Sequence, residues 1–269
     1  MNKKIYVRSI LCALFLTLMF HGFKVSADEC LNDMLTRVKG KEDCLAIHTY
    51  ITPSEIKPSS LVIFIHGDQS DGGPVSSMIK LAQDIDVPTG VVKIALLRPG
   101  YFDKAGNAST GTNFRRRDSY TPANMDEVTS AIQSLQRYYG ISHTVIVGHS
   151  GGAAYAGVMI GRTPGIANSA LLLSCPCDIH RWRASNQSTP WSSLSPSSFA
   201  ATVPTNMRVI AITGDSDNNT REFLAEAYID ALAKGGVSAQ FRRAVGAGHN
   251  ETVNVEVVAQ PLRTLLRLN

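Results

Sequence analysis

The segment TVIVGHSGGAAYAG, residues 144–157, places a serine between an apolar run and a stretch of small residues. Its first half favours a buried strand and its second half favours a helix, so Ser150 lies at the turn between them. A tight strand-to-helix turn exposes the serine hydroxyl, and it requires small residues two positions before and two positions after the serine. Gly148 and Gly152 meet this requirement. The segment therefore predicts a nucleophile elbow with Ser150 as the nucleophile.

Apolar runs alternate with helical patterns along the rest of the chain. Six runs rich in Val, Ile and Leu predict strands, the last one more weakly: residues 61–67, 91–99, 144–150, 169–175, 207–214 and 238–249. Helices are predicted at residues 75–85, 121–139, 152–161 and 220–236, and from about residue 250 onward. Pro261 is expected to bend or break the last helix. The alternation predicts an α/β fold with a mostly parallel central sheet and helices on both faces.

A serine nucleophile needs a base, and the base needs a partner that orients it. Asp217 follows a predicted strand and lies three residues beyond Gly214, where the chain can turn the carboxylate toward a histidine. Asp215 is expected to brace the same turn, and Asp178 is the reserve candidate for the acid. His249 comes last, in VGAGHNET, where neighbouring glycines leave the backbone free to aim the ring.

Hydrolysis at a serine also needs an oxyanion hole made of backbone N–H groups. One N–H group is expected from Gly151, directly after the nucleophile. The other is expected from Asp68 in FIHGDQSDGG, residues 64–73, with the Asp68 carboxylate pointing away from the oxyanion. His66 is expected to brace this loop without a catalytic role.

The first 27 residues have the pattern of a secretory signal peptide. Lys3, Lys4 and Arg8 precede a short apolar run, and small residues follow it, with cleavage expected after Ala27. Four of the 26 basic residues and none of the 22 acidic residues lie in this segment, so residues 28–269 have no net formal charge. That balance disfavours a nucleic-acid partner. We expect a secreted or periplasmic protein with no stable membrane anchor after cleavage.

Four cysteines remain after cleavage, and an even number in an exported protein favours disulfides. We favour a Cys30–Cys44 bond. Cys175 and Cys177 either form a bond with each other or stay reduced. A metal site that also uses His180 is the less favoured alternative, because a fourth ligand is missing.

These motifs together resemble the α/β-hydrolase superfamily. The resemblance rests on HGD at 66–68, RPGYFDKAG at 98–106, GHSGG at 148–152, TGDSD at 213–217 and GAGH at 246–249. Within the superfamily, the chain is most similar to secreted serine hydrolases grouped with the catalytic domains of prolyl oligopeptidases and dienelactone hydrolases. The resemblance implies that residues 28–269 form one catalytic domain with a Ser150–Asp217–His249 triad and a minimal cap.

The expected reaction is acyl transfer from a carboxylic ester, or a related acyl compound, to water. It requires no metal or organic cofactor. A small serine peptidase acting on short peptides is the second hypothesis, and an inactive α/β-hydrolase fold that only binds a ligand is the third. The oligomeric state stays open.

Two further features bear on the substrate. Arg115, Arg116 and Arg117 form a basic run that would either bind an anionic part of the substrate or face solvent, and the solvent-facing alternative is favoured. The composition of residues 182–206 fits a surface loop or a small cap, and equally a disordered loop. Trp182 and Trp191 in this segment would either line the site or pack beneath it.

Overall fold

The computed structural model describes residues 30–51, 57–189 and 191–267. The predicted signal peptide, residues 1–27, lies outside this part of the chain. Within it, no helix combines the length and apolar character needed to cross a bilayer.

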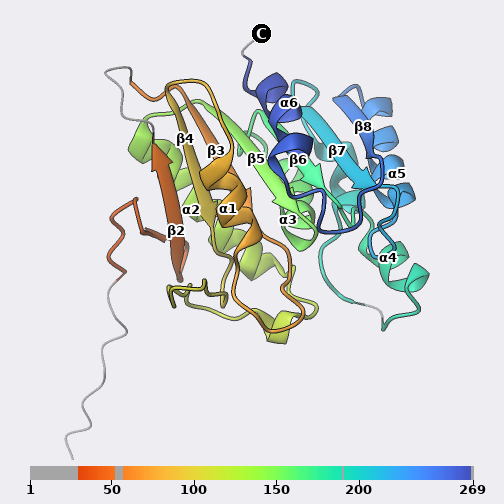
Figure 1. The fold of residues 1–269 in the computed structure, drawn as a ribbon, viewed down its shortest axis with the longest axis horizontal. Helices are drawn as coiled ribbons and strands as arrows, with labels where there is room; N and C mark the ends of the chain where they lie inside the picture. The colour runs from red at the N-terminus through yellow and green to blue at the C-terminus, as the bar shows by residue number, and fades with distance from the viewer. Residues whose placement is uncertain (1–29, 52–56, 190, 268–269) are drawn as a thin grey trace, which may run out of the picture.

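The described residues form one eight-stranded sheet with the order β1-β2-β4-β3-β5-β6-β7-β8 (Figure 1). Strands β3 to β8 all run parallel to one another, whereas β2 is antiparallel to both β1 and β4. The strands are β1 (Arg37–Lys39), β2 (Cys44–Ile51), β3 (Ser60–Ile65), β4 (Val91–Leu96), β5 (His143–His149), β6 (Ser169–Leu173), β7 (Arg208–Gly214) and β8 (Ser238–Ala244). The predicted mostly parallel sheet is confirmed, and all six predicted strands are present.

The helices cover both faces of the sheet, as predicted (Figure 1). They are α1 (Ser77–Asp84), α2 (Pro122–Tyr139), α3 (Gly151–Arg162), α4 (Ile179–Ser185), α5 (Glu222–Lys234) and α6 (Val255–Leu266). One apolar cluster joins α2, α3 and α5 to the sheet, and a second joins α1 and α6 to the opposite face. Strand side chains alternate between the two clusters: Ile63 packs in the first, and Val62 and Phe64 pack in the second.

The last helix differs from the prediction in two ways. It begins after Asn254, whose side chain accepts a hydrogen bond from the N–H of Val257, and not near residue 250. It also continues through Pro261 without a break. Proline removes one helical hydrogen bond, but Pro261, Leu262 and Leu265 are buried against the sheet, and this packing holds the helix together.

Two disulfides link the cysteines. Cys30 is bonded to Cys44, which ties the start of the described chain to β2 and confirms the favoured pairing. Cys175 is bonded to Cys177 directly after β6, so neither thiol is free to bind a metal. The cap is small: between β6 and β7 the chain forms α4, a loop and a short 3-10 helix at Pro196–Thr202.

Candidate active site

Ser150 lies between β5 and α3 with φ 52° and ψ −119°, a left-handed conformation that non-glycine residues seldom adopt. The turn is as crowded as the sequence predicted. A Cβ atom on Gly152 would overlap the carbonyl oxygen of Ile65, and one on Gly148 would overlap the carbonyl oxygen of Gly152. The two glycines therefore allow the backbone approach that places Ser150 at the end of the sheet.

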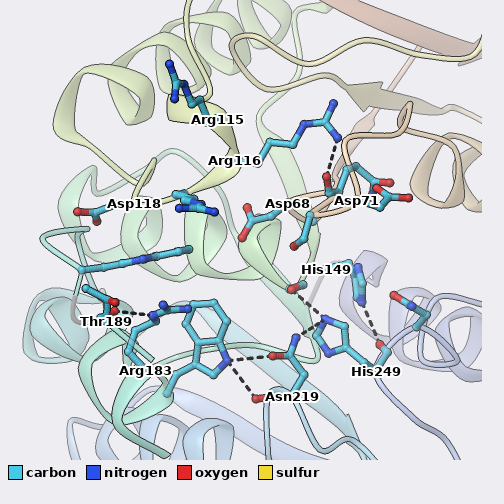
Figure 2. Close-up of a pocket in the computed structure, with 18 residues that line it drawn as sticks. Asp68, Asp71, Arg115, Arg116, Asp118, His149, Arg183, Thr189, Asn219 and His249 are labelled. Atoms are coloured by element: carbon cyan, nitrogen blue, oxygen red, sulfur yellow. Dashed lines mark hydrogen bonds between the residues drawn. The ribbon is translucent and has the colours of Figure 1, made fainter. Parts of the chain in front are cut away.

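The structure brings the three residues of the predicted triad together (Figure 2). Nε2 of His249 lies 3.0 Å from Oγ of Ser150. Nδ1 of His249 lies 2.9 Å from Oδ2 of Asp217. These residues follow β5, β7 and β8, so the carboxyl ends of three strands supply the group.

The environment of Asp217 keeps its carboxyl group ionised. The backbone N–H groups of Asn219 and Thr220 and the hydroxyl of Thr220 donate hydrogen bonds to it. Burial acts to raise the pKa of Asp217, but the hydrogen bonds from His249 and Thr220 outweigh burial and lower the pKa to about 2. A carboxylate at this position favours the protonated form of His249 when the imidazole accepts a proton.

The two other candidate acids lie elsewhere. Asp215 accepts a hydrogen bond from the N–H of Gly246 and so braces the turn, as expected. Asp178 caps α4 by accepting a bond from the N–H of Arg181. Neither carboxylate hydrogen-bonds to His249 among the described residues.

Two neighbours of His249 were not assigned a site role from the sequence. Thr220 has its Oγ1 3.1 Å from Nδ1 of His249 and 3.0 Å from the carbonyl oxygen of Ser174. Asn219 has its Nδ2 3.3 Å from Nε2 of His249, and its carbonyl oxygen accepts a bond from the indole of Trp182. The spacing of Thr220, three residues after Asp217, is the only sequence signal for this contact.

The two predicted donors of the oxyanion hole, the N–H groups of Gly151 and Asp68, have no hydrogen-bond partner within the described part of the chain. The Asp68 carboxylate lies against Gly151, because a Cβ on that glycine would overlap it. It binds Nη2 of Arg98 at 2.7 Å and the hydroxyl of Tyr120 at 2.6 Å. The ion pair with Arg98 compensates a negative charge that would otherwise oppose an oxyanion.

Arg98 is fully buried, and it was not assigned a site role from the sequence. Its guanidinium carbon lies 4.7 Å from the ring centre of Tyr101 and 4.8 Å from that of Tyr155. Nη2 donates to the carbonyl oxygen of Gly67 as well as to Asp68. His66 accepts the backbone N–H of Arg98, so it braces the loop as expected.

His149, the residue before the serine, supports the backbone of His249. Its Nε2 lies 3.0 Å from the carbonyl oxygen of His249, to which it donates a hydrogen bond. Burial of the ring, and after it the nearby charge of His249, lower the pKa of His149 to about 4. His149 is therefore neutral at physiological pH.

The buried His149 predicts a specific loss of stability in acid. The unfolded chain takes up this proton near pH 6.5, whereas the folded chain resists it until about pH 4. The neutral His149 therefore adds nothing to the pH dependence above pH 6.5. As the pH falls from 6.5 to 4, the free energy of unfolding decreases by about 3 kcal/mol in total. We expect His149→Gln to reduce the slope of unfolding free energy against pH in this window, measured by urea titration. An unchanged slope would contradict the burial of a neutral ring.

A cavity of about 1030 Å³ opens at Ser150 and His249 (Figure 2). Loops after β3, β5 and β7 line it, together with the Arg115–Asp118 segment and the α4 region. Trp182 and Trp191 are its large apolar side chains, and the other lining residues are mostly charged or polar. The arginine run and both tryptophans therefore lie at the cavity that holds the serine.

Comparison with known proteins shows where this architecture occurs. No family model and no curated protein sequence matches the chain. Among solved structures, Est1E from Butyrivibrio proteoclasticus, with ferulic acid bound, superposes with a TM-score of 0.62 at 14% identity, over 86% of this chain and 97% of that one. The chain has the α/β-hydrolase fold.

Two other structures with this fold show its range. An esterase from Pyrococcus furiosus has a TM-score of 0.65 at 12% identity, over 86% of this chain and 90% of that one. The acylaminoacyl peptidase of Pyrococcus horikoshii has a TM-score of 0.60 at 12% identity, over 80% of this chain but only 37% of the peptidase. At these identities the likeness establishes the α/β-hydrolase fold alone.

Proposed function

We propose that the protein is an exported serine hydrolase that cleaves a carboxylic ester through an acyl-enzyme on Ser150. The observation that carries the proposal is the hydrogen-bonded chain from Oγ of Ser150 through His249 to Asp217, with distances of 3.0 and 2.9 Å, at the floor of a cavity. An isolated serine hydroxyl is a poor nucleophile, and a base at hydrogen-bond distance is what activates it.

The proposed reaction has two half-reactions. Nε2 of His249 takes the hydroxyl proton as Oγ of Ser150 bonds to the carbonyl carbon, and the N–H groups of Gly151 and Asp68 bind the oxyanion. His249 then gives the proton to the leaving alcohol as the ester bond breaks. Water attacks the acyl-enzyme in the same way, with His249 as the base, and releases the acid and free Ser150. Every bond is formed and broken by the chain's own residues and water, so the proposal includes no cofactor.

The proposed location is outside the cytoplasm. The signal-like residues 1–27 support it, as do the Cys30–Cys44 and Cys175–Cys177 disulfides, since such bonds persist in oxidising compartments. The proposed partners are small ester substrates, with no nucleic acid among them.

A fluorophosphonate probe tests the proposal directly. We expect the mature protein, residues 28–269, to gain one adduct, which peptide mass spectrometry places on Ser150, and a Ser150→Ala variant to gain none. Absence of an adduct on folded protein would contradict the proposal and favour a fold that only binds a ligand. An adduct at another serine would contradict the assignment of Ser150.

A small serine peptidase is the second candidate, because the acylaminoacyl peptidase shares the α/β-hydrolase fold. Chromogenic short-chain esters and aminoacyl arylamides separate the two candidates. Faster turnover of the esters is expected. Hydrolysis of the arylamides at a higher kcat/KM would favour the peptidase.

A further inference from the structure

The cavity at Ser150 carries an unusual set of charged side chains. Its lining includes four arginines and three aspartates: Arg115, Arg116, Arg117, Arg183, Asp68, Asp71 and Asp118. Which of these charges are available to a ligand depends on what each side chain already contacts.

The aspartates are held by donors of the protein itself. Asp68 is paired with the buried Arg98. Asp118 accepts hydrogen bonds from the backbone N–H groups of Ser192 and Ser193, at 2.9 and 2.7 Å. Asp71 accepts one from the N–H of Gly73. Of the three aspartates, Asp68 is therefore compensated by a cation, whereas Asp118 and Asp71 keep their negative charge and are fixed in place by backbone N–H groups.

Two of the arginines are also engaged or turned away. Nη1 of Arg116 donates to the carbonyl oxygens of Gln69 and Gly73, which fixes this side chain to the loop after β3. Arg115 points away from His249 in Figure 2. Arg117 and Arg183 remain as cations that could meet a ligand.

Arg183 is held in one orientation. Its Nε donates to the carbonyl oxygen of Thr189 at 2.9 Å, and its guanidinium carbon lies 4.5 Å from the ring centre of Trp191. Its two terminal nitrogens have no hydrogen-bond partner among the described residues. A guanidinium fixed at Nε with a free outer edge can bind the two oxygens of a carboxylate or phosphate side by side.

Arg117 supplies a second positive charge to the same region. Its side chain is exposed and lines the cavity. The backbone before it is strained, because Phe114, Arg115 and Arg116 have φ values of 49°, 56° and 62°. Such strain is concentrated at ligand sites, where the surrounding structure maintains it. Burial lowers the pKa of Arg183, Tyr120 and Asp118 act to raise it, and the charge of Arg117 acts to lower it.

Arg183 and Arg117 both line the cavity that holds Ser150, and the positive charge of each favours an anion bound there. We propose that the substrate carries an anionic group, a carboxylate or a phosphate, which Arg183 and Arg117 bind while the scissile carbonyl lies at Ser150. The indole of Trp191 forms a wall beside this group. The inference rests on the proposed hydrolase function for the reaction, but the binding of the anion can be measured without it.

Tryptophan fluorescence gives the measurement that needs no activity. The chain contains two tryptophans, and both line the cavity. We expect a saturable change in emission when the mature protein is titrated with glutarate or with inorganic phosphate at constant ionic strength, and none with neutral glutaramide. The two anions show whether carboxylate or phosphate is preferred.

Variants locate the anion. Arg183→Gln and Arg117→Gln are each expected to weaken the apparent affinity at least about tenfold, because one charge-assisted contact is lost. Arg181→Gln is the matched control, since Arg181 is exposed on the same helix and lies outside the cavity lining. No response to either anion, or an equal response in Arg183→Gln, would overturn the inference.

A pair of esters connects the anion site to catalysis. We expect mono-4-nitrophenyl glutarate to be hydrolysed with a higher kcat/KM than neutral 4-nitrophenyl butyrate, and the ratio of the two to fall about tenfold in Arg183→Gln. Equal ratios in the wild type and the variant would refute the anionic substrate while leaving the hydrolase proposal standing. Saturable anion binding without hydrolysis or a fluorophosphonate adduct would refute the hydrolase and leave the anion site standing.

Discussion

His249→Ala is expected to lower kcat/KM by a factor of about a thousand or more toward any ester that the protein hydrolyses. The hydroxyl of Ser150 has its only basic hydrogen-bond partner in Nε2 of His249, within the described part of the chain. Without that nitrogen, the proton has no acceptor during attack and the leaving alcohol has no donor. Initial rates with a chromogenic ester measure the loss, and circular dichroism checks that the variant folds.

His180→Ala is the matched control for this variant. His180 is an exposed histidine at the start of α4, outside the lining of the cavity, so its replacement is expected to leave the rate within about twofold. A His249→Ala protein that folds and keeps a tenth of the wild-type rate would show that another group takes the proton.

Gly152→Ala is expected to reduce the free energy of unfolding by about 3 kcal/mol or to prevent folding. The new Cβ would overlap the carbonyl oxygens of Ile65 and His66, which belong to the end of β3 and the loop after it. Backbone cannot yield as a flexible side chain can, so α3 would have to move away from the sheet. Urea titration measures the change in midpoint.

Gly235→Ala provides the comparison for the glycine prediction. Gly235 follows the last residue of α5 and has φ −77°. The atom nearest to a Cβ added at Gly235 would be the carbonyl oxygen of Leu232, at 3.3 Å. Its replacement is expected to change stability by less than about 0.5 kcal/mol. Equal stabilities of the two variants would mean that the turn at Ser150 accommodates a Cβ atom at position 152, contrary to the structure.

The strands that form the centre of the fold could be predicted because each is a nearly continuous aliphatic run buried on both faces. Strands β1 and β2 could not be predicted in this way. β1 has only three residues, and β2 mixes His48, Thr49 and Tyr50 with aliphatic side chains, as an antiparallel strand near the edge can. A bend or a break was expected at Pro261, and no break occurs, because local propensity is weaker than the packing of α6 on the sheet.

Part of the candidate site could likewise be predicted from the sequence, and part of it could not. Ser150, Asp217 and His249 could be placed together because parallel strands bring their carboxyl ends to one edge of the sheet. The contacts of Arg98 with Asp68 and of Asn219 with Trp182 join loops that no periodic pattern relates. The solvent-facing position favoured for the arginine run holds for Arg115 and Arg117, which are exposed, and all three arginines also line the cavity.

The order of the strands also bears on when the protein can become active during folding. The parts of the site are spread along the chain from Gly67 to His249, and the last of them follows β8, which is the final strand to be synthesised and lies at the edge of the sheet. Pairing of distant segments is the slow part of forming a parallel sheet. A chain that has not yet docked β8 holds a serine without its base, so hydrolytic activity would be among the last properties to appear, and its recovery after dilution from urea would report completion of the whole sheet.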